Sequence, residues 1–310
     1  MNQKRILITD PVHDDGIKKL KAAGFTVEER YGESPSVIKE LIRDYDVLIV
    51  RSATKVTREI LAESSLQVIC RAGVGLDNID LDAAKEYNIT VFNTPNAPSV
   101  SVAELVIGLI VALFRHISIG DKGLKEGRWL KKELKGLELK GKTLGIVGFG
   151  NIGIEVAKRA KSFEMTVLAF DVLDSALEHA KQMNVEPFGP SIEALEAILR
   201  NADVITLHVP LLPSTYHMIG EREFSLMKDG VYLINASRGG VVDEKALLEA
   251  IRSKKVAGAA LDVFEKEPPG KSELINEPNV IATPHIGSTT QETQKNASLI
   301  LAKEIIDFFS

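Results

Sequence analysis

The sequence predicts an α/β protein with two doubly wound parallel sheets, each in its own domain. Short β-branched runs alternate with amphipathic stretches along both halves of the chain, which is typical of parallel sheets covered by helices. A glycine-rich turn, at residues 148–153, marks the start of the second sheet near the middle of the chain. The 310 residues, 45% of them hydrophobic, suffice for two modest cores.

The first hundred residues carry strand-like apolar runs separated by helix-like patterns. The predicted strands are Ile6–Thr9, Val47–Val50 and Val68–Cys70. The predicted helices are Asp14–Ala23, Ser36–Arg43 and Leu81–Tyr87. A proline-rich turn then precedes a long helical pattern over Val100–Ile119, for which Ser99 or Ser101 offers an N-cap.

The second half of the chain begins after a polar, lysine-rich stretch at 121–142 that holds the only tryptophan, Trp129. Six strand candidates then fit a complete dinucleotide-binding sheet. They are Thr143–Val147, Thr166–Phe170, Val204–Leu207, Val231–Ile234, Ala257–Leu261 and Val280–Ala282. A final amphipathic helix is expected within 289–310. If that helix packs back on the first unit, residues 1–97 and 288–310 form one domain and residues 98–287 an inserted one.

Composition argues against several classes of partner. The net charge of −5 gives no strong field toward nucleic acid or an acidic membrane. The longest apolar run, Leu105 to Phe114, is half of what a membrane span needs, and the N-terminal apolar stretch is too short for a signal peptide. The single cysteine, Cys70, reads as a buried small hydrophobe. We expect a cytoplasmic protein with no metal site.

The glycine-rich turn, Gly148-Phe149-Gly150-Asn151-Ile152-Gly153, is a G-x-G-x-x-G pattern between an apolar strand and an amphipathic helix. Its glycines permit a tight turn, close approach of backbone to a pyrophosphate, and close helix–strand packing. Asp171 ends the next strand, where a carboxylate binds ribose hydroxyls and repels a 2′-phosphate. NAD is therefore expected rather than NADP. The residues expected to hold it here are Gly148, Gly150, Asn151, Ile152, Gly153 and Asp171.

Nicotinamide-dependent reduction of a keto acid needs an acid that protonates the alkoxide and a cation that holds the carboxylate. Of the six histidines, His208 and His285 each follow a predicted strand and so can face the crevice beside the cofactor. Position favours His285, at the point where the chain leaves the inserted domain, and leaves His208 open. Arg238 precedes two glycines just beyond a strand, and a guanidinium suits planar carboxylate recognition. Glu267 stands in an acidic loop that reads less clearly.

These motifs, in this order, resemble the D-isomer-specific 2-hydroxyacid dehydrogenase family over essentially the whole chain. The resemblance implies a Rossmann-type cofactor domain inserted into a flavodoxin-like substrate domain. It also implies that Arg238 grips the carboxylate and carbonyl, that Glu267 pairs with His285, and that His285 is the acid. Asp262 would hold the nicotinamide amide. The other residues expected along the cofactor path are His208, Val209, Pro210, Thr215, Ala236, Ser237, Arg238, His285 and Gly287.

Within the family, the stretches at 50–57, 71–78, 103–105 and 261–264 are similar to those of members that oxidise D-3-phosphoglycerate to 3-phosphohydroxypyruvate, the first step of serine biosynthesis. By that resemblance, backbone amides of Gly73, Val74 and Gly75 would meet the substrate carboxylate. Arg51 and Arg71 would take the phosphate. Three further residues complete the expected substrate set, namely Ser52, Asn78 and, from a neighbouring subunit, Lys131.

Two alternatives stay open. The same mechanism would serve a glyoxylate or hydroxypyruvate reductase, and a non-catalytic NAD-sensing corepressor would share the fold. Many members of the predicted specificity carry an added serine-binding regulatory domain, and we expect neither that domain nor its tetramer here. The long helix at 100–119 and the arm around Trp129 favour a homodimer formed through the cofactor domain.

Overall fold

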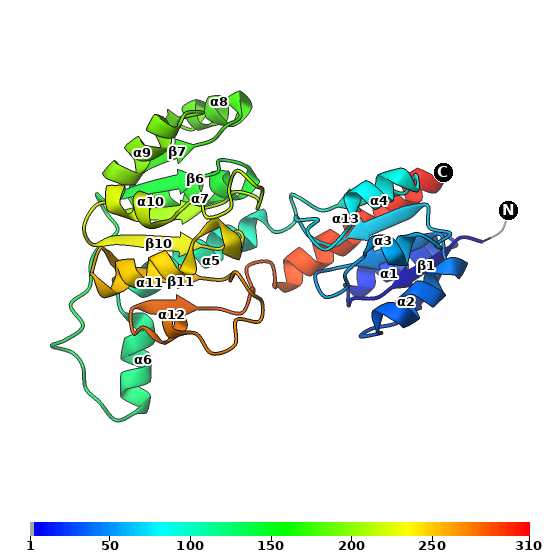
Figure 1. Ribbon diagram of the computed structural model, residues 1–310, viewed down its shortest axis with the longest axis horizontal. Coiled ribbons are helices and arrows are strands. Elements are labelled where there is room, and N and C mark those ends of the chain that lie inside the picture. Colours follow the sequence, from blue (N-terminus) through cyan, green and yellow to red (C-terminus); the bar gives the residue numbers. More distant parts are fainter. Residues whose placement is uncertain (1–2) are drawn as a thin grey trace. The chain divides into compact units, whose positions relative to one another are not determined.

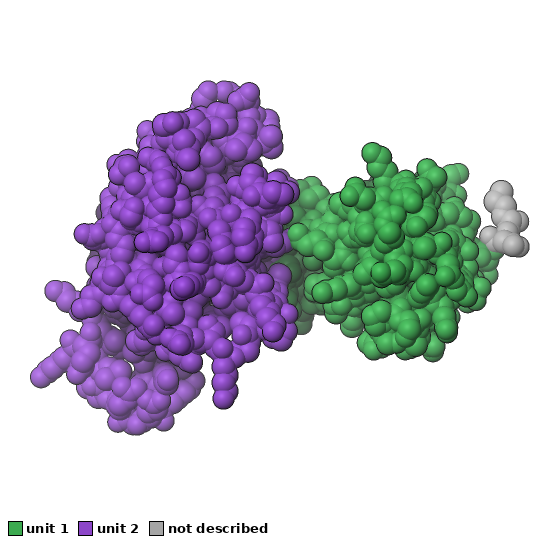
Figure 2. Space-filling model, viewed as in Figure 1, with its two compact units in different colours: residues 1–98, 288–310 green, residues 99–287 purple. Residues whose placement is uncertain are grey.

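The computed structural model describes residues 3–310, and the chain divides into two compact units. The first unit runs to Pro98 and resumes over Ser288–Ser310, and the second comprises Ser99–Gly287. Figure 2 shows the two units in different colours. Each has its own buried apolar clusters, so each is described by itself below.

The sheet of the first unit has five parallel strands within the described residues, in the order β2-β1-β3-β4-β5. The strands are β1 (Arg5–Ile8), β2 (Thr26–Glu29), β3 (Val47–Val50), β4 (Val68–Arg71) and β5 (Thr90–Asn93). This is the flavodoxin-like order, which confirms the expected fold class. The buried runs of β1, β3 and β4 were predicted. The edge strands β2 and β5 were not, because they are only half-buried and their apolar pattern is weak.

Helices cover both faces of this sheet, and the last one returns from the far end of the chain (Figure 1). They are α1 (Asp14–Ala22), α2 (Pro35–Leu41), the 3-10 turn η1 (Ile42–Asp44), α3 (Arg58–Leu61), α4 (Leu81–Glu86) and α13 (Gln291–Phe309). Helix α13 packs on α1 so closely that a Cβ on Gly16 would lie 2.0 Å from Ser298 Oγ. Its residues Leu301 and Ile305 are fully buried in the same cluster as Ile6. The final helix is therefore part of the first unit's core.

The second unit contains seven parallel strands among its described residues, in the order β12-β11-β10-β9-β6-β7-β8. The strands are β6 (Thr143–Val147), β7 (Thr166–Phe170), β8 (Glu186–Phe188), β9 (Val204–Leu207), β10 (Val231–Asn235), β11 (Val256–Leu261) and β12 (Val280–Ala282). The order is that of a Rossmann sheet with one added strand. The prediction of six strands was wrong by one. Strand β8 holds Pro187, which an edge strand tolerates because no neighbour needs its missing N–H.

The helices of the second unit flank this sheet (Figure 1). They are α5 (Ser99–Phe114), α6 (Ile117–Lys125), α7 (Asn151–Ser162), α8 (Asp174–Gln182), α9 (Ile192–Asn201), α10 (Glu221–Leu226), the 3-10 turn η2 (Gly239–Val241), α11 (Glu244–Arg252) and α12 (Glu273–Asn276). The single helix predicted over Val100–Ile119 is wrong, because His116 adopts a left-handed conformation (φ 52°) and separates α5 from α6. Between residues 3 and 310 no single helix is long and apolar enough to cross a membrane. Only α5 and α6 taken together, bent by 65°, meet that test by length and composition.

Candidate active site

The glycine-rich turn links β6 to α7, and its geometry fits a pyrophosphate. Gly148 is left-handed (φ 96°), and a Cβ there would lie 2.5 Å from the carbonyl oxygen of His208. A Cβ on Gly153 would lie 2.4 Å from the Gly148 carbonyl oxygen, so only glycine lets α7 approach the strand this closely. A Cβ on Gly150 would meet no described atom within 4 Å. Space therefore opens at the N-terminus of α7, where backbone N–H groups and the helix dipole favour an anion.

Asp171 follows β7 and ties the glycine-rich turn to it. Its Oδ2 accepts a hydrogen bond from the Phe149 N–H (2.7 Å), and its Oδ1 accepts one from the Leu173 N–H (2.9 Å). Each carboxylate oxygen keeps a second acceptor position, because a carboxylate offers about four. The group is thus placed to accept from ribose hydroxyls while it orients the turn. Asn151 is exposed and Ile152 half-buried at the start of α7.

The three residues expected to be catalytic follow three neighbouring strands of the second unit. Arg238 follows β10, Glu267 follows β11 and His285 follows β12. These strands are adjacent and parallel, so their carboxyl ends share one edge of the sheet. His285 Nδ1 lies 2.7 Å from Glu267 Oε2, and the two side chains are 42% and 38% exposed. The structure therefore brings together an imidazole–carboxylate pair that a ligand can reach.

The segments that carry Arg238 and Glu267 touch through backbone. A Cβ on Gly239 would lie 1.9 Å from the carbonyl carbon of Phe264, so glycine is required where the two loops meet. Glu267 Oε1 also accepts a hydrogen bond from the Phe264 N–H (3.2 Å). The loop that presents the guanidinium and the loop that presents the carboxylate are consequently held as one piece.

Asn235 fixes the turn before Arg238, and the sequence analysis missed it. The side chain is 1% exposed. Its Nδ2 donates to the Arg238 carbonyl (2.9 Å), and its Oδ1 accepts from the N–H and hydroxyl of Ser237 (3.1 and 2.9 Å). Asparagine is common in the turns that follow strands, so the sequence alone does not distinguish Asn235 from an ordinary turn residue.

Asp262 holds the loop that contains His285. Its Oδ1 accepts from the Thr283 hydroxyl (2.6 Å) and the Ile286 N–H (2.8 Å), and its Oδ2 accepts from the Gly287 N–H (2.8 Å). His285 itself is left-handed (φ 51°), a strained conformation that these bonds on either side help to maintain. The expected contact with a nicotinamide amide would use the one acceptor position that remains, on Oδ2.

His208, the rival to His285, differs from it in surroundings. Its Nε2 lies 3.0 Å from Thr206 Oγ1, and its buried Nδ1 has no hydrogen-bond partner among the described residues. Burial lowers the pKa of the His208 imidazole to about 3, so the ring is neutral at physiological pH. A neutral imidazole is a poor source of the proton that carbonyl reduction consumes. His285, which is exposed and paired with Glu267, is therefore the better candidate for the acid.

The remaining residues expected along the cofactor path lie on the same unit. Thr215 organises the turn after β9, because its hydroxyl donates to the Pro210 carbonyl (2.6 Å) and accepts from the Leu212 N–H (2.8 Å). Val209 packs against the main core cluster, and Ala236 and Gly287 are half-buried and buried at the sheet edge. Within residues 3–310, no group of three or more His, Cys, Asp and Glu side chains is arranged to hold a metal ion.

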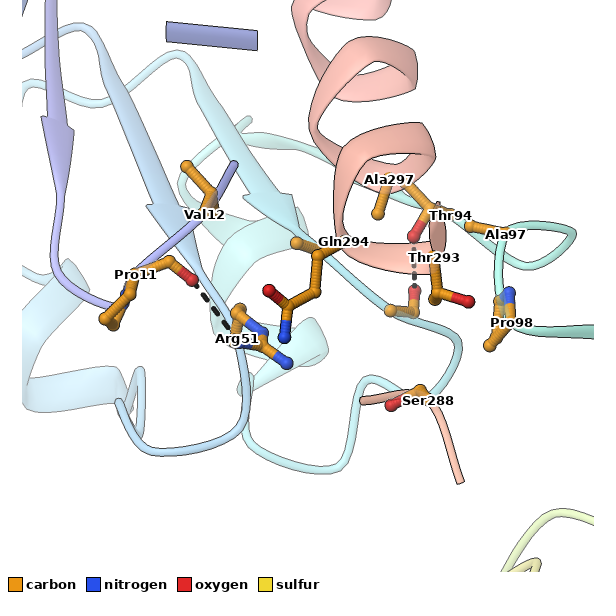
Figure 3. A pocket seen from close by; sticks show the side chains of 12 residues that line it. Pro11, Val12, Arg51, Thr94, Ala97, Pro98, Ser288, Thr293, Gln294 and Ala297 are labelled. Carbon is orange, nitrogen blue, oxygen red and sulfur yellow. Dashed lines mark hydrogen bonds between the residues drawn. The ribbon is translucent and has the colours of Figure 1, made fainter. Parts of the chain in front are cut away.

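The first unit has a pocket of its own, at the carboxyl ends of β1, β3, β4 and β5 (Figure 3). Its lining residues are Pro11, Val12, Arg51, Ala72, Gly73, Thr94, Ala97, Pro98, Ser288, Thr293, Gln294 and Ala297. Arg51 Nη1 donates to the Pro11 carbonyl (3.4 Å), and Figure 3 shows the Gln294 side chain directed toward Arg51. The sequence analysis missed Gln294, because only the return of α13 brings it to this pocket.

The other residues expected to bind substrate are spread around the same strand ends, with one exception. The Arg71 guanidinium covers Gly73, where a Cβ would lie 1.5 Å from Arg71 Nη1. Val74 and Gly75 are half-buried in the following turn, and Ser52 is exposed. The exception is Lys131, which lies exposed on the second unit, and its expected contact from a neighbouring subunit stays a prediction. Asn78 donates hydrogen bonds to the backbone carbonyls of Arg51 and Thr54, in the turn that follows β3.

Cys70, predicted to be a buried hydrophobe, is fully buried in β4. Burial raises the pKa of its thiol well above the usual range. The thiolate is therefore disfavoured, and the residue packs as a small apolar side chain, as the sequence indicated.

Comparison with known proteins places these features in a family. Residues 107–287 match the family described as "D-isomer specific 2-hydroxyacid dehydrogenase, NAD binding domain". Similar curated proteins include the D-3-phosphoglycerate dehydrogenase of Methanocaldococcus jannaschii, 48% identical over 97% of this chain and 56% of that protein. The hydroxypyruvate reductase of Thermotoga maritima is 45% identical over 98% of both chains. The chain thus spans about half the length of the phosphoglycerate dehydrogenases that it matches.

A solved structure shares the fold over nearly the whole chain. The D-lactate dehydrogenase of Aquifex aeolicus, in complex with NAD and lactic acid, matches with a TM-score of 0.83. It is 33% identical, over 98% of this chain and 95% of that one. The second unit therefore contains the family's NAD-binding domain, in agreement with the G-x-G-x-x-G turn and Asp171.

Proposed function

Because the chain belongs to the D-isomer specific 2-hydroxyacid dehydrogenase family, we propose that it oxidises D-3-phosphoglycerate to 3-phosphohydroxypyruvate with NAD, the first step of serine biosynthesis. The observation that carries the chemistry is the His285–Glu267 contact of 2.7 Å beside Arg238 on one sheet edge. The observation that carries the substrate is the pocket of the first unit, which holds Arg51 and Gln294.

The proposed mechanism assigns one task to each residue of the second unit. The Gly148–Gly153 turn would hold the pyrophosphate of NAD and Asp171 a ribose, and the cofactor would supply the acceptor for the hydride from C2. His285 Nε2 accepts the proton of the C2 hydroxyl and returns it in the reverse direction. Glu267 stabilises the resulting imidazolium through Nδ1 and keeps the ring oriented. Arg238 binds the carboxylate. Its positive charge also stabilises the negative charge on the C2 oxygen in the transition state of either direction.

Arg51→Gln is expected to raise the KM for D-3-phosphoglycerate about 10- to 100-fold and to leave that for hydroxypyruvate unchanged. The reason is that a hydrogen bond to a charged group contributes about 1.5–3 kcal/mol, and each 1.4 kcal/mol is about a factor of ten. Steady-state kinetics that follow NADH absorbance with both substrates check this. Arg43→Gln, which removes a surface arginine of the same unit paired with Glu63, is the matched control. Equal losses on both substrates would mean that Arg51 does not recognise phosphate.

A second candidate reaction is the reduction of hydroxypyruvate or glyoxylate by the same residues. It is supported by the Thermotoga maritima relative, a hydroxypyruvate reductase that is 45% identical over 98% of this chain. The substrate panel separates the two functions. A kcat/KM for hydroxypyruvate well above that for 3-phosphohydroxypyruvate would favour the reductase.

We also propose a homodimer formed through the second unit. Trp129 is 75% exposed, and its neighbours along α6 and the arm that follows expose further apolar side chains, namely Ile117, Leu124 and Leu137. Exposed apolar side chains concentrated on one segment support a contact with a second subunit. The cytoplasmic location stays a prediction.

Trp129→Glu is expected to shift the protein from dimer to monomer in sedimentation velocity, because a carboxylate at an apolar contact is costly to bury. The control is Ile192→Glu, since Ile192 is an exposed apolar residue of the same unit at the start of α9. A wild-type protein that sediments as a monomer at working concentration would refute the proposed dimer.

A further inference from the structure

The turn that carries Arg51 is held by side chains from both neighbouring strands. It follows β3, which lies between β1 and β4 in the sheet. Asp10 follows β1 and Asn78 follows β4, so the two side chains approach the Arg51–Thr54 turn from opposite sides. Asp10 and Thr54 are 4% and 7% exposed, so these contacts lie out of water.

Asp10 satisfies the donors of the turn. Its Oδ2 accepts from the N–H groups of Arg51 (2.6 Å) and Thr54 (3.2 Å). Its Oδ1 lies 2.9 Å from the Thr54 hydroxyl, which also lies 2.9 Å from the hydroxyl of Thr9. Three donors therefore converge on one buried carboxylate, which can only accept.

Asn78 satisfies the acceptors of the same turn. Its Nδ2 donates to the carbonyl oxygens of Arg51 (2.8 Å) and Thr54 (2.7 Å). The N–H and C=O of both end residues are thus bound by two side chains from different strands. The guanidinium of Arg51 also donates a long hydrogen bond (3.4 Å) to the carbonyl of Pro11, the residue after Asp10.

We infer that Asp10 and Asn78 are positioning residues, which determine specificity for a phosphorylated substrate by holding Arg51 ready at the pocket. The inference rests on the proposed function, since it takes Arg51 as the group that binds phosphate. Asp10 does not line the pocket, and its negative charge would oppose a phosphate. It therefore acts through Arg51, by fixing the turn before substrate arrives, so that less freedom is lost on binding.

Asp10→Asn is the first test. The carboxamide keeps the size of the side chain but turns an NH2 group toward a donor of the turn, leaving that donor unpaired. The expected result is a KM for D-3-phosphoglycerate at least ten times higher, with kcat within about twofold and the kinetics with hydroxypyruvate unchanged. Two milder variants serve if Asp10→Asn does not fold. Thr54→Val loses the hydroxyl and should show the same selective rise in the KM for D-3-phosphoglycerate, whereas Thr54→Ser should behave as wild type.

The control for general destabilisation is Asp46→Asn. Asp46 belongs to the same unit but lies before β3, where it accepts from the Arg5 N–H (2.9 Å) and pairs with Lys4 (2.7 Å). This variant should leave both KM values unchanged. A selective loss in Asp46→Asn equal to that in Asp10→Asn would overturn the inference, because it would show that stability of the unit, not the Arg51 turn, sets the affinity.

A double variant distinguishes this inference from the proposed function. In an Arg51→Gln background, Asp10→Asn should change the KM for D-3-phosphoglycerate less than twofold, and effects that multiply would overturn the inference. If Arg51→Gln alone shows no preference between substrates, the proposed role of Arg51 fails instead. Amide hydrogen exchange then tests the role of Asp10 separately. Faster exchange at Arg51 and Thr54 in Asp10→Asn would support the proposal that Asp10 holds this turn, and unchanged exchange would refute it.

Discussion

His285→Ala is expected to lower kcat about 1000-fold while the affinity for NADH stays within a fewfold of wild type. General acid–base catalysis contributes about 100- to 10,000-fold, and alanine provides no group to exchange the proton with the C2 oxygen. NADH affinity should persist because the Gly148–Gly153 turn and Asp171, which would carry most of it, are formed by other segments. Single-turnover kinetics and NADH fluorescence titration measure the two quantities.

The matched control for this variant is His179→Ala, since His179 is an exposed histidine of the same unit on α8. Its kcat should equal that of wild type. The kcat of Glu267→Gln should lie between those of the two histidine variants, because this change keeps the imidazole but removes the carboxylate at its Nδ1. Substantial turnover in His285→Ala, lost on further replacement of His208, would transfer the acid role to His208.

Arg238→Gln is expected to lower kcat/KM about 100- to 1000-fold on every substrate, phosphorylated or not. Removing one donor to a developing oxyanion costs about that much, and the carboxylate common to all 2-hydroxy acids loses its cation as well. Arg238→Lys should recover only part of the loss, because an ammonium keeps the charge but cannot bind a carboxylate through two parallel N–H groups. Steady-state kinetics with D-3-phosphoglycerate, hydroxypyruvate and glyoxylate check both variants.

The control for Arg238 is Arg222→Gln on α10, where the arginine is exposed and pairs with Glu196 and Glu223. A surface pair of this kind contributes little, so its kinetics should not change. Loss of activity confined to the phosphorylated substrate in Arg238→Gln would contradict the assignment, since it would place the phosphate, not the carboxylate, at Arg238.

The sheet of the second unit could be predicted well from sequence because its strands are buried on both faces. Such strands appear as continuous apolar runs, and β6, β7 and β9 begin and end at the predicted residues. Edge strands lack this signal: β2 has a single strongly apolar residue, Val27, and β8 contains Pro187. The break at His116 also escaped prediction, because neither glycine nor proline marks it.

Some residues of the candidate site could likewise be predicted from local sequence patterns, and others could not. The glycine-rich turn and Asp171 carry local patterns whose chemistry needs no knowledge of the fold. Local position could not decide between His208 and His285, and the difference in burial that separates them exists only in the folded chain. Asp10 and Gln294 were not found at all, because their roles depend on which strands and helices become neighbours.

The return of α13 to the first unit imposes an order on folding during synthesis. The N-terminal ninety-eight residues cannot complete their core until Leu301, Ala302 and Ile305 have been made. By then the whole inserted unit has been translated, and domains generally fold as units while translation proceeds. The segment made first is thus expected to be the last to reach its native state, and a chain that ends at Gly287 should have a folded NAD-binding domain and an N-terminal region sensitive to protease.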